Sequence, residues 1–244
     1  ALKEYYRNVQ GVFQDPFSSY NPIFKADRVF QIIHDEFFPD VKPADWEGKV
    51  WKSLEAVGLN PKHVLHKYPH QLSGGQLQRF LIARALLLDI KFLVADEIIS
   101  MLDASTRIDV LNLLGDLKKR GLSVLFITHD LSLGYYISER AVILYRGCVT
   151  EMGDPGKIFE NPLHPYTQAL MSAIPIADPR KAGSRDRIIL EGDVPSPLNP
   201  PQGCRFHPRC PYAIKGTCEV EIPIFKDYGD GHYVACWLVE KNYG

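Results

Sequence analysis

A glycine-rich segment in the first half of the chain is well suited to bind an anion. Its residues are Leu72, Ser73, Gly74, Gly75 and Gln76. Glycines that open a helix expose backbone N–H groups to phosphate oxygens, because no Cβ obstructs the approach, and the helix N-terminus adds partial positive charge. Serine at this place is also a common helix cap. The segment predicts either a seat for a phosphate chain or a capped glycine-rich turn.

Two acidic residues follow a buried strand about twenty residues later. The apolar run 91–95 ends on Asp96 and Glu97, at the end of a strand where α/β folds place their ligands. Asp96 is suited to hold Mg²⁺ through its water shell, and Glu97 to polarise an attacking water. The apolar run 123–128 leads to His129, which can contact a transferred phosphate. With the glycine-rich segment, these residues predict phosphoryl transfer, with Glu97 and His129 as catalytic candidates.

Four of the five cysteines gather near the C-terminus. They are Cys204, Cys210, Cys218 and Cys236, spaced C-x5-C-x7-C-x17-C. This proline-rich region can bury little apolar surface, so a central metal cross-link would supply what a core lacks. Four thiolates fit Zn²⁺ or an iron–sulfur cluster, and the spacing lacks the short C-x2-C knuckles of many zinc sites. Disulfides and unligated thiols are the alternatives, and His207 is a spare ligand candidate.

The middle of the chain alternates strand and helix. Apolar runs predict strands over 91–95 and 123–128, and apolar residues at helical spacing predict a helix over 106–120 between them. Such a unit belongs to a parallel sheet. Residues 141–145 and 148–151 predict a tight hairpin. The fold class is therefore α/β.

Two regions differ from this core. Residues 17–68 show helical spacing of apolar residues and no buried-strand run, and residues 175–223 hold nine of the 18 prolines. Proline fixes φ and removes a donor, so regular structure should be scarce there. We expect a core over 1–16 and 71–172, a helical subdomain over 17–70, a proline-rich linker over 173–203 and an irregular cysteine-containing tail over 204–244.

Composition excludes several classes of protein. The 28 basic and 29 acidic residues give a net charge of −1, without the basic excess of a dedicated nucleic-acid binder. The hydrophobic share of 45% permits a buried core, and no run of about 18 apolar residues predicts a membrane span. The sequence begins without methionine and without the apolar stretch of a signal peptide. We expect it to be part of a longer chain.

Five motifs in order resemble those of the nucleotide-binding subunits of ATP-binding cassette (ABC) transporters. They are a Q-loop at 12–16, the signature at 72–76, Walker B at 92–97, the D-loop at 100–103 and the switch residue His129. The resemblance implies a parallel-sheet ATPase core with a helical insert, and two such subunits that ATP closes head to tail. It implies that ATP and Mg²⁺ are bound by Gln14, Ser73, Gly74, Gly75, Gln76, Asp96 and Asp103.

Residues 161–170 and 194–210 are similar to the oligopeptide/dipeptide importer subfamily. This resemblance implies uptake of peptides, nickel chelates or oligosaccharides. Its implied partners are transmembrane permease subunits, a second ATP-binding subunit and, indirectly, an extracytoplasmic solute-binding protein, with no nucleic acid. The chain would lie peripherally on the cytoplasmic face of the cell membrane. The resemblance also favours a [4Fe–4S] cluster over Zn²⁺ at the four cysteines.

The sequence departs from the family pattern at three places. Ile98 stands where proline is usual, and Met101 replaces a small D-loop residue. Both could alter the angle at which the chain leaves the strand and the contact surface between the two subunits of the dimer. No G-x-x-x-x-G-K-[ST] phosphate loop is present in the 244 residues, so it lies upstream of Ala1 or has been lost. That absence favours one alternative, a non-hydrolysing metal-binding interaction module. A soluble ABC ATPase of nucleic-acid metabolism is another, though coiled-coil arms and paired cassettes are missing.

The missing phosphate loop yields a first prediction. The 244-residue chain should hydrolyse ATP no faster than background, because Asp96 and Glu97 can hold metal and water but cannot cradle the β- and γ-phosphates alone. A version extended upstream to include a phosphate loop should be active. Phosphate release by the purified proteins measures both. Metal-dependent turnover by the 244-residue chain that disappears in Glu97→Gln would contradict the prediction.

Overall fold

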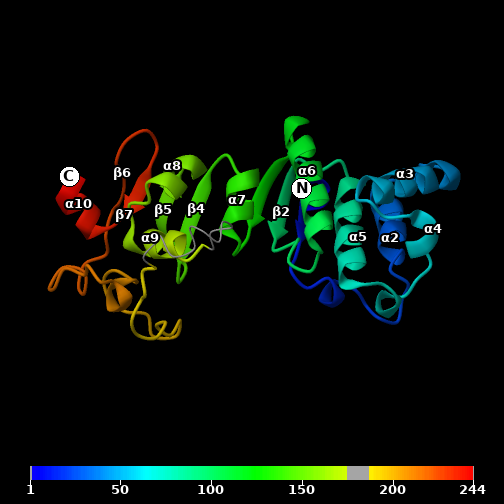
Figure 1. Cartoon of the computed structure of the whole chain (residues 1–244). Helices are drawn as coiled ribbons and strands as arrows, with labels where there is room; N and C mark the ends of the chain where they lie inside the picture. The colour runs from blue at the N-terminus through cyan, green and yellow to red at the C-terminus, as the bar shows by residue number, and fades with distance from the viewer. Residues whose placement is uncertain (1, 175–186, 244) are drawn as a thin grey trace, which may run out of the picture. The chain divides into compact units, whose positions relative to one another are not determined.

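The computed structural model describes residues 2–174 and 187–243 and divides the chain into two compact units (Figure 1). The first unit runs to His129 and the second begins at Asp130. Part of the expected linker, residues 175–186, lies outside the described residues. Among the described residues, no helix combines the length and the apolar character needed to cross a membrane.

A three-stranded parallel sheet forms the centre of the first unit. Its strands are β1 (Val9–Val12), β2 (Phe92–Asp96) and β3 (Ser123–Ile127), in the order β1-β2-β3. In β2, Leu93 and Ala95 have no exposed surface. Because the strands are parallel, their carboxyl ends meet at one edge of the sheet. The chain segments that follow all three strands therefore start close together.

The predicted strand, helix and strand are confirmed to within one or two residues. The intervening helix is α6 (Ala104–Lys119), which begins after the N-cap Asp103. It ends before Gly121, whose φ of +99° is a conformation that side-chain-bearing residues rarely adopt. A further short helix, α1 (Leu2–Asn8), precedes β1.

Helices fill the segment between β1 and β2. They are the 3-10 turns η1 (Phe17–Ser19) and η2 (Pro69–Gln71) and the helices α2 (Arg28–Phe37), α3 (Pro43–Ala56), α4 (Pro61–Val64) and α5 (Gly74–Leu86). The ring of Phe30 on α2 stacks on Phe80 of α5 at 4.7 Å between centroids, and Leu54 of α3 is fully buried. These contacts join the helical segment to α5. The exact domain boundaries stay a prediction.

An antiparallel sheet organises the second unit. Its strands are β4 (Ala141–Tyr145), β5 (Cys148–Gly153), β7 (Tyr233–Ala235) and β6 (Phe225–Asp227), in that spatial order. Its helices are α7 (Leu131–Ile137), α8 (Pro155–Glu160), α9 (Pro165–Ser172) and α10 (Trp237–Tyr243). The predicted hairpin of β4 and β5 is confirmed. Its two turn residues, Arg146 and Gly147, both have the positive φ that a tight hairpin turn needs.

The tail is more regular than the sequence predicts. Within residues 187–224 the only helix or strand that the structure describes is the 3-10 turn η4 (His207–Arg209), as the prolines suggest. Residues 225–235, however, return as β6 and β7, and β7 pairs with β5. An unpaired edge of β5 offers a row of hydrogen-bonding groups, and pairing with it orders a segment whose own sequence signal is weak.

A buried carboxylate fastens this returning strand. Glu151 on β5 has no exposed surface. Its Oε1 accepts a hydrogen bond from the backbone N–H of Leu163 (2.8 Å) and lies 2.6 Å from Nε2 of His232, while Oε2 accepts from the N–H of His164 (3.0 Å). The single side chain thus joins β5, the start of α9 and the turn before β7. No feature of the sequence marks it.

Replacing Glu151 by alanine should release the returning strand. The change leaves two backbone N–H groups and His232 without their buried acceptor, a loss of about 3 kcal/mol or more. Hydrogen exchange of Tyr233–Ala235 should accelerate by about 100-fold or more relative to the unmodified chain. The exposed Glu160, replaced by alanine, is the control and should leave these rates unchanged. Equal exchange in both variants would contradict the role given to Glu151.

Candidate active site

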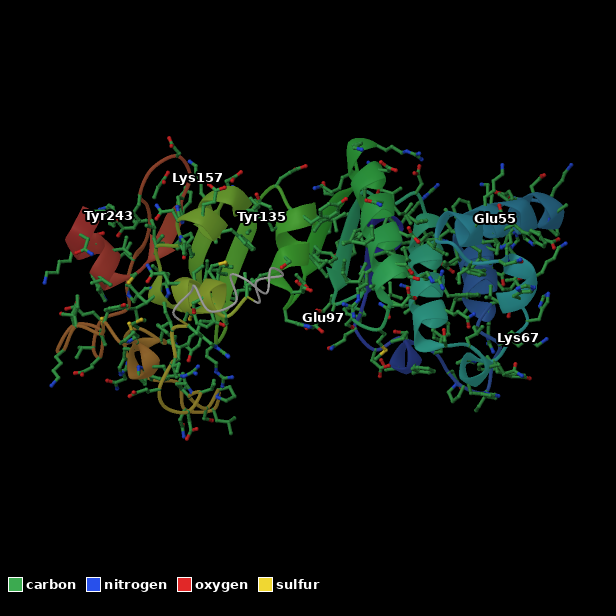
Figure 2. The ribbon with its side chains drawn as sticks, in the orientation of Figure 1. Glu55, Lys67, Glu97, Tyr135, Lys157 and Tyr243 are labelled. Carbon is green, nitrogen blue, oxygen red and sulfur yellow. The ribbon has the colours of Figure 1, made fainter. Side chains whose placement is uncertain are left out.

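Three predicted site residues meet at the carboxyl edge of the parallel sheet. Gln14 follows β1, Glu97 directly follows β2 and His129 follows β3. Gln14 Nε2 donates to Glu97 Oε2 at 2.7 Å, and His129 Nδ1 lies 3.0 Å from Glu97 Oε1. In Figure 2, Glu97 is labelled at this edge. One carboxylate is therefore held by a side chain on each of the two neighbouring strand ends.

The backbone of Glu97 is strained. Its φ of 49° is left-handed, a conformation that costs a residue with a side chain about 1 kcal/mol or more. Its N–H donates to the carbonyl of Ile127 on β3 at 2.9 Å, which extends the ladder by one residue. The side chain is 21% exposed, whereas that of His129 is 73% exposed. The carboxylate is thus fixed in direction while it remains accessible to water and to a ligand.

The glycine-rich segment forms the N-terminus of α5, as predicted. Ser73 is the N-cap, and its Oγ accepts from the N–H of Gln76 at 3.1 Å, while the Gln76 side chain accepts from the N–H of Ser73 at 2.9 Å. A Cβ on Gly74 would stand 3.4 Å from the sulfur of Met101, and one on Gly75 would stand 3.2 Å from Leu102. The capping role of Ser73 is thus real. Gly74 and Gly75 also pack closely on the D-loop, which is a second reason why glycine occupies these two positions.

Asp103 caps α6 and is fully engaged within its own chain. Its carboxylate accepts from the hydroxyl of Ser105 (2.6 Å) and from both the N–H (3.0 Å) and the hydroxyl (2.8 Å) of Thr106. These hydrogen bonds hold the pKa of Asp103 well below its usual range. Asp103 is therefore a fixed negative charge at the end of the D-loop.

Asp96, the predicted Mg²⁺ ligand, is the last residue of β2 and lies directly before Glu97. Its side chain is neither fully buried nor fully exposed. Mg²⁺ commonly keeps several waters and takes one or two carboxylates together with substrate phosphates. The position of Asp96 at the sheet edge suits this type of binding.

Two of the three departures from the family pattern, Ile98 and Met101, lie in different surroundings. Ile98 is completely buried and extends the apolar core beneath the strand end. Met101 is 48% exposed and lies against Gly74, so the enlarged D-loop residue contacts the signature within one chain. Neither residue displaces Glu97 from Gln14 and His129.

The sequence did not reveal how α5 contacts the end of β1 and the Q-loop. Gln78 is 1% exposed, and its Nε2 donates to the carbonyl of Phe13 at 3.1 Å. Arg84 Nη2 donates to the carbonyl of Gly11 at 3.0 Å. Buried polar side chains on a largely apolar helix could have signalled such contacts, but their partners are known only from the fold.

The C-terminal cysteines are all free thiols in the structure. Gly203, with a φ of +64°, lies so close to the backbone of Cys218 that a Cβ would stand 2.5 Å from its carbonyl oxygen. Next to it, Cys204 N–H donates to the same carbonyl at 2.9 Å, and the N–H of Ile214 donates to Cys218 Sγ at 3.3 Å. Glycine at 203 thus permits the approach of Cys204 to Cys218.

Burial and mutual proximity both act on these thiols. Burial raises the pKa of Cys204 and Cys236, and raises that of Cys210 to about 11; the neighbouring cysteines add to each rise. Among the described residues, which include all four cysteines, no three or more His, Cys, Asp or Glu side chains are arranged to hold a metal ion. A cluster or zinc site therefore stays a prediction.

Comparison with protein families matches two models to the chain. The model described as "ABC transporter" matches residues 1–100, and that described as "Oligopeptide/dipeptide transporter, C-terminal region" matches residues 150–218. The first includes Gln14, the signature segment and Glu97. The second includes three of the four clustered cysteines.

Similar proteins include the oligopeptide transport ATP-binding protein AppF of Bacillus subtilis, 44% identical over 95% of this chain and 70% of the relative. The dipeptide transport ATP-binding protein DppF of Escherichia coli is 43% identical over 97% of this chain and 69% of the relative. Among solved structures, a dimeric ATP-binding cassette in a post-hydrolysis state with ADP and Pi is 26% identical, with a TM-score of 0.57 over 63% of this chain and 66% of that chain.

Proposed function

Because this chain belongs to the family of ATP-binding proteins of oligopeptide and dipeptide ABC transporters, we propose that it powers uptake of peptides or related solutes. ATP would draw two such subunits together head to tail, and hydrolysis would let them separate. The observation that carries the proposal is the carboxylate of Glu97, held between Gln14 and His129 at the edge of the sheet.

Glu97 is the proposed general base for the attacking water. Its two oxygens are oriented by Gln14 and His129, so a water at the exposed side of the carboxylate would meet an acceptor of fixed direction. His129, largely exposed, would contact the γ-phosphate. Asp96 would hold Mg²⁺, which neutralises charge on the phosphate oxygens when bound. Gln14 would respond to the γ-phosphate and to Mg²⁺. Movement of its side-chain amide would change the hydrogen bond that orients Glu97.

The signature segment has a different role in the proposed dimer. The N-terminus of α5, from Ser73 to Gln76, would bind the γ-phosphate in the partner's site, since a helix N-terminus favours anions. Gly74 and Gly75 allow the close approach. Asp103, held as a fixed negative charge by Ser105 and Thr106, would orient the D-loop in the seam between the subunits.

The proposed partners follow from the transport role. They are transmembrane permease subunits, a second ATP-binding subunit and, indirectly, an extracytoplasmic solute-binding protein, and the chain would lie at the cytoplasmic face of the membrane. The solute would never touch this subunit, so its residues do not distinguish peptides from nickel chelates or oligosaccharides. The family relationship favours neither a nucleic-acid ATPase nor a pure interaction module.

Glu97→Gln tests the proposed catalytic role. In the version extended upstream to include a phosphate loop, this variant should lose turnover by about 100-fold or more, because the amide cannot accept the proton of water. ATP affinity should persist, so saturating ATP and Mg²⁺ should trap the dimer. Phosphate release and size-exclusion chromatography measure the two effects.

Gly74→Asp is the contrasting variant. Its carboxylate would stand where the γ-phosphate arrives, and its Cβ would approach Met101. This variant should remain monomeric with ATP. A monomeric Glu97→Gln protein at saturating nucleotide, or a Gly74→Asp protein that dimerises normally, would contradict the head-to-tail scheme.

We also propose that Cys204, Cys210, Cys218 and Cys236 ligate one metal centre, preferably a [4Fe–4S] cluster and otherwise Zn²⁺. The support is the hydrogen bond from the Cys204 N–H to the Cys218 carbonyl, the close approach at Gly203 and the family resemblance of the tail. Buried thiols with raised pKa values are protonated at neutral pH. Metal binding would therefore have to release their protons and rearrange the cysteine side chains.

Anaerobic purification tests the metal centre. The expected result is absorbance at about 400 nm with iron and sulfide bound, lost in Cys204→Ser and retained in Cys148→Ser. Cys148 is the matched control because it is exposed on β5, outside the group of four. One zinc per chain without iron would refute the cluster. Absence of metal together with paired cysteines would refute the site.

A further inference from the structure

Helix α5 holds the backbone that leads into the Q-loop. Gln78 Nε2 donates to the carbonyl of Phe13, and Arg84 Nη2 donates to the carbonyl of Gly11. These two acceptors lie one and three residues before Gln14, whose side chain orients Glu97. The helix that begins at the signature therefore fixes the position of the residue that supports the catalytic carboxylate.

The same junction contains polar atoms that lack partners. In the described part of the chain, Gln78 Oε1, Arg84 Nε and Tyr20 Oη are buried without a hydrogen bond. Burial lowers the pKa of Arg84 and raises that of Tyr20, and attraction between the two groups partly offsets both shifts. Unpaired buried polar groups are costly, so packing alone does not explain them. They provide donors and acceptors that a second arrangement of the Q-loop could use.

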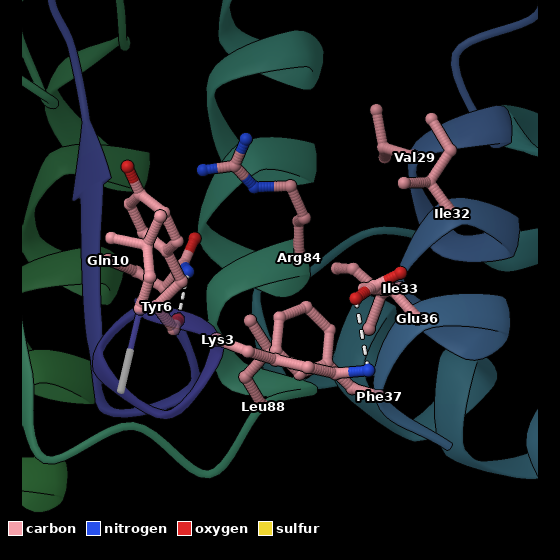
Figure 3. A pocket seen from close by; sticks show the side chains of 11 residues that line it. Lys3, Tyr6, Gln10, Val29, Ile32, Ile33, Glu36, Phe37, Arg84 and Leu88 are labelled. Atoms are coloured by element: carbon pink, nitrogen blue, oxygen red, sulfur yellow. Dashed lines mark hydrogen bonds and ion pairs between the residues drawn. The ribbon is translucent and has the colours of Figure 1, made fainter. Parts of the chain in front are cut away.

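There is also room for such a rearrangement. A cavity of about 500 Å³ lies between α1, β1, α2 and α5, and Arg84 lines it together with Gln10 and Tyr6 (Figure 3). Across the same cavity, Lys3 forms an ion pair with Glu36 at 3.0 Å. The side chain of Arg84 thus borders open space on one side and the β1 backbone on the other.

Helix α5 is suited to transmit a displacement along its length. Its buried residues include Leu77, Phe80, Leu81, Ile82, Ala83 and Ala85. A helix packed along most of its length moves as a body, because its side chains interlock with their neighbours. A displacement of the helix at Ser73 would therefore also displace the carbonyls of Phe13 and Gly11, which accept hydrogen bonds from Gln78 and Arg84.

We infer that Gln78 and Arg84 are positioning residues that couple the signature to the Q-loop of the same chain. The inference rests on the proposed dimer. There, the signature completes the partner's ATP site, whereas Gln14 and Glu97 serve the chain's own site. Phosphate bound at Ser73 would move α5, and α5 would set Gln14 through the carbonyls of Gly11 and Phe13. The coupling makes ATP use at the two sites cooperative.

Substitutions that keep size but remove the hydrogen bonds test this coupling. The variants are Gln78→Met and Arg84→Met in the version extended upstream to include a phosphate loop, with Arg84→Lys as the conservative change. Hydrolysis is measured against ATP concentration. The Hill coefficient should exceed 1 in the unmodified protein, approach at most about 2 for two sites, and fall to about 1 in both methionine variants. Arg84→Lys should restore it at least in part.

Arg79→Met is the matched control. Arg79 lies on the same helix but donates to the carbonyls of Gly75, Val57 and Gly58, all outside the Q-loop. This variant loses comparable hydrogen bonds and should keep the cooperativity of the unmodified protein. A merely structural role for Gln78 and Arg84 would lower the melting temperature of all three methionine variants alike and leave the Hill coefficient unchanged.

Hydrogen exchange supplies a readout independent of turnover. In Glu97→Gln protein with no change in α5, MgATP should protect the backbone amides of residues 11–17 from exchange. Adding Gln78→Met should remove this protection, while the amides of residues 74–77 remain protected. An unchanged Hill coefficient with unchanged protection of residues 11–17 overturns the coupling. Failure of Glu97→Gln to form an ATP dimer would instead overturn the proposed function, so the two failures are distinguishable.

Discussion

The parallel pairing of β1, β2 and β3 is the constraint on which the site depends. Residues separated by more than eighty positions meet because parallel strands end at one edge. Gln14, Glu97 and His129 each follow one of these strands, and the carboxylate between them binds both neighbours. The left-handed φ of Glu97 is sustained because its N–H continues the ladder to Ile127. The geometry of the candidate site is thus a direct consequence of strand pairing.

Helix α5 gives this sheet edge a second connection. Its N-terminus carries the signature, and its middle and end donate hydrogen bonds to the backbone before Gln14. The signature segment and the backbone before Gln14 are therefore joined by one helix rather than by a loop. Under the proposed dimer scheme, such a connection would relate nucleotide binding at the signature to the position of Gln14.

The second unit is organised by a different interaction, the buried carboxylate of Glu151. It fastens the strand β7 to β5 and also holds the start of α9. Phe206 anchors the loop that carries Cys204 and Cys210, since it is 1% exposed and packs on Tyr145 and Tyr166. Side-chain contacts with the rest of the second unit therefore hold the cysteine region at several points. A segment so rich in proline could not be ordered by helices or strands alone.

Local sequence patterns were enough to predict the α/β class, the strand, helix and strand of the core, the hairpin of residues 141–145 and 148–151, and the identity of the motif residues. These depend on local patterns: apolar runs, helical spacing, and glycine and serine at a helix start. The folded chain was needed to show that Gln14 and His129 hold the two oxygens of Glu97. It was also needed to show that Gln78 and Arg84 hold the backbone just before Gln14. It alone decided the return of β7 to β5, because contacts between distant segments depend on the register of strands and the packing of helices, which leave no local signal.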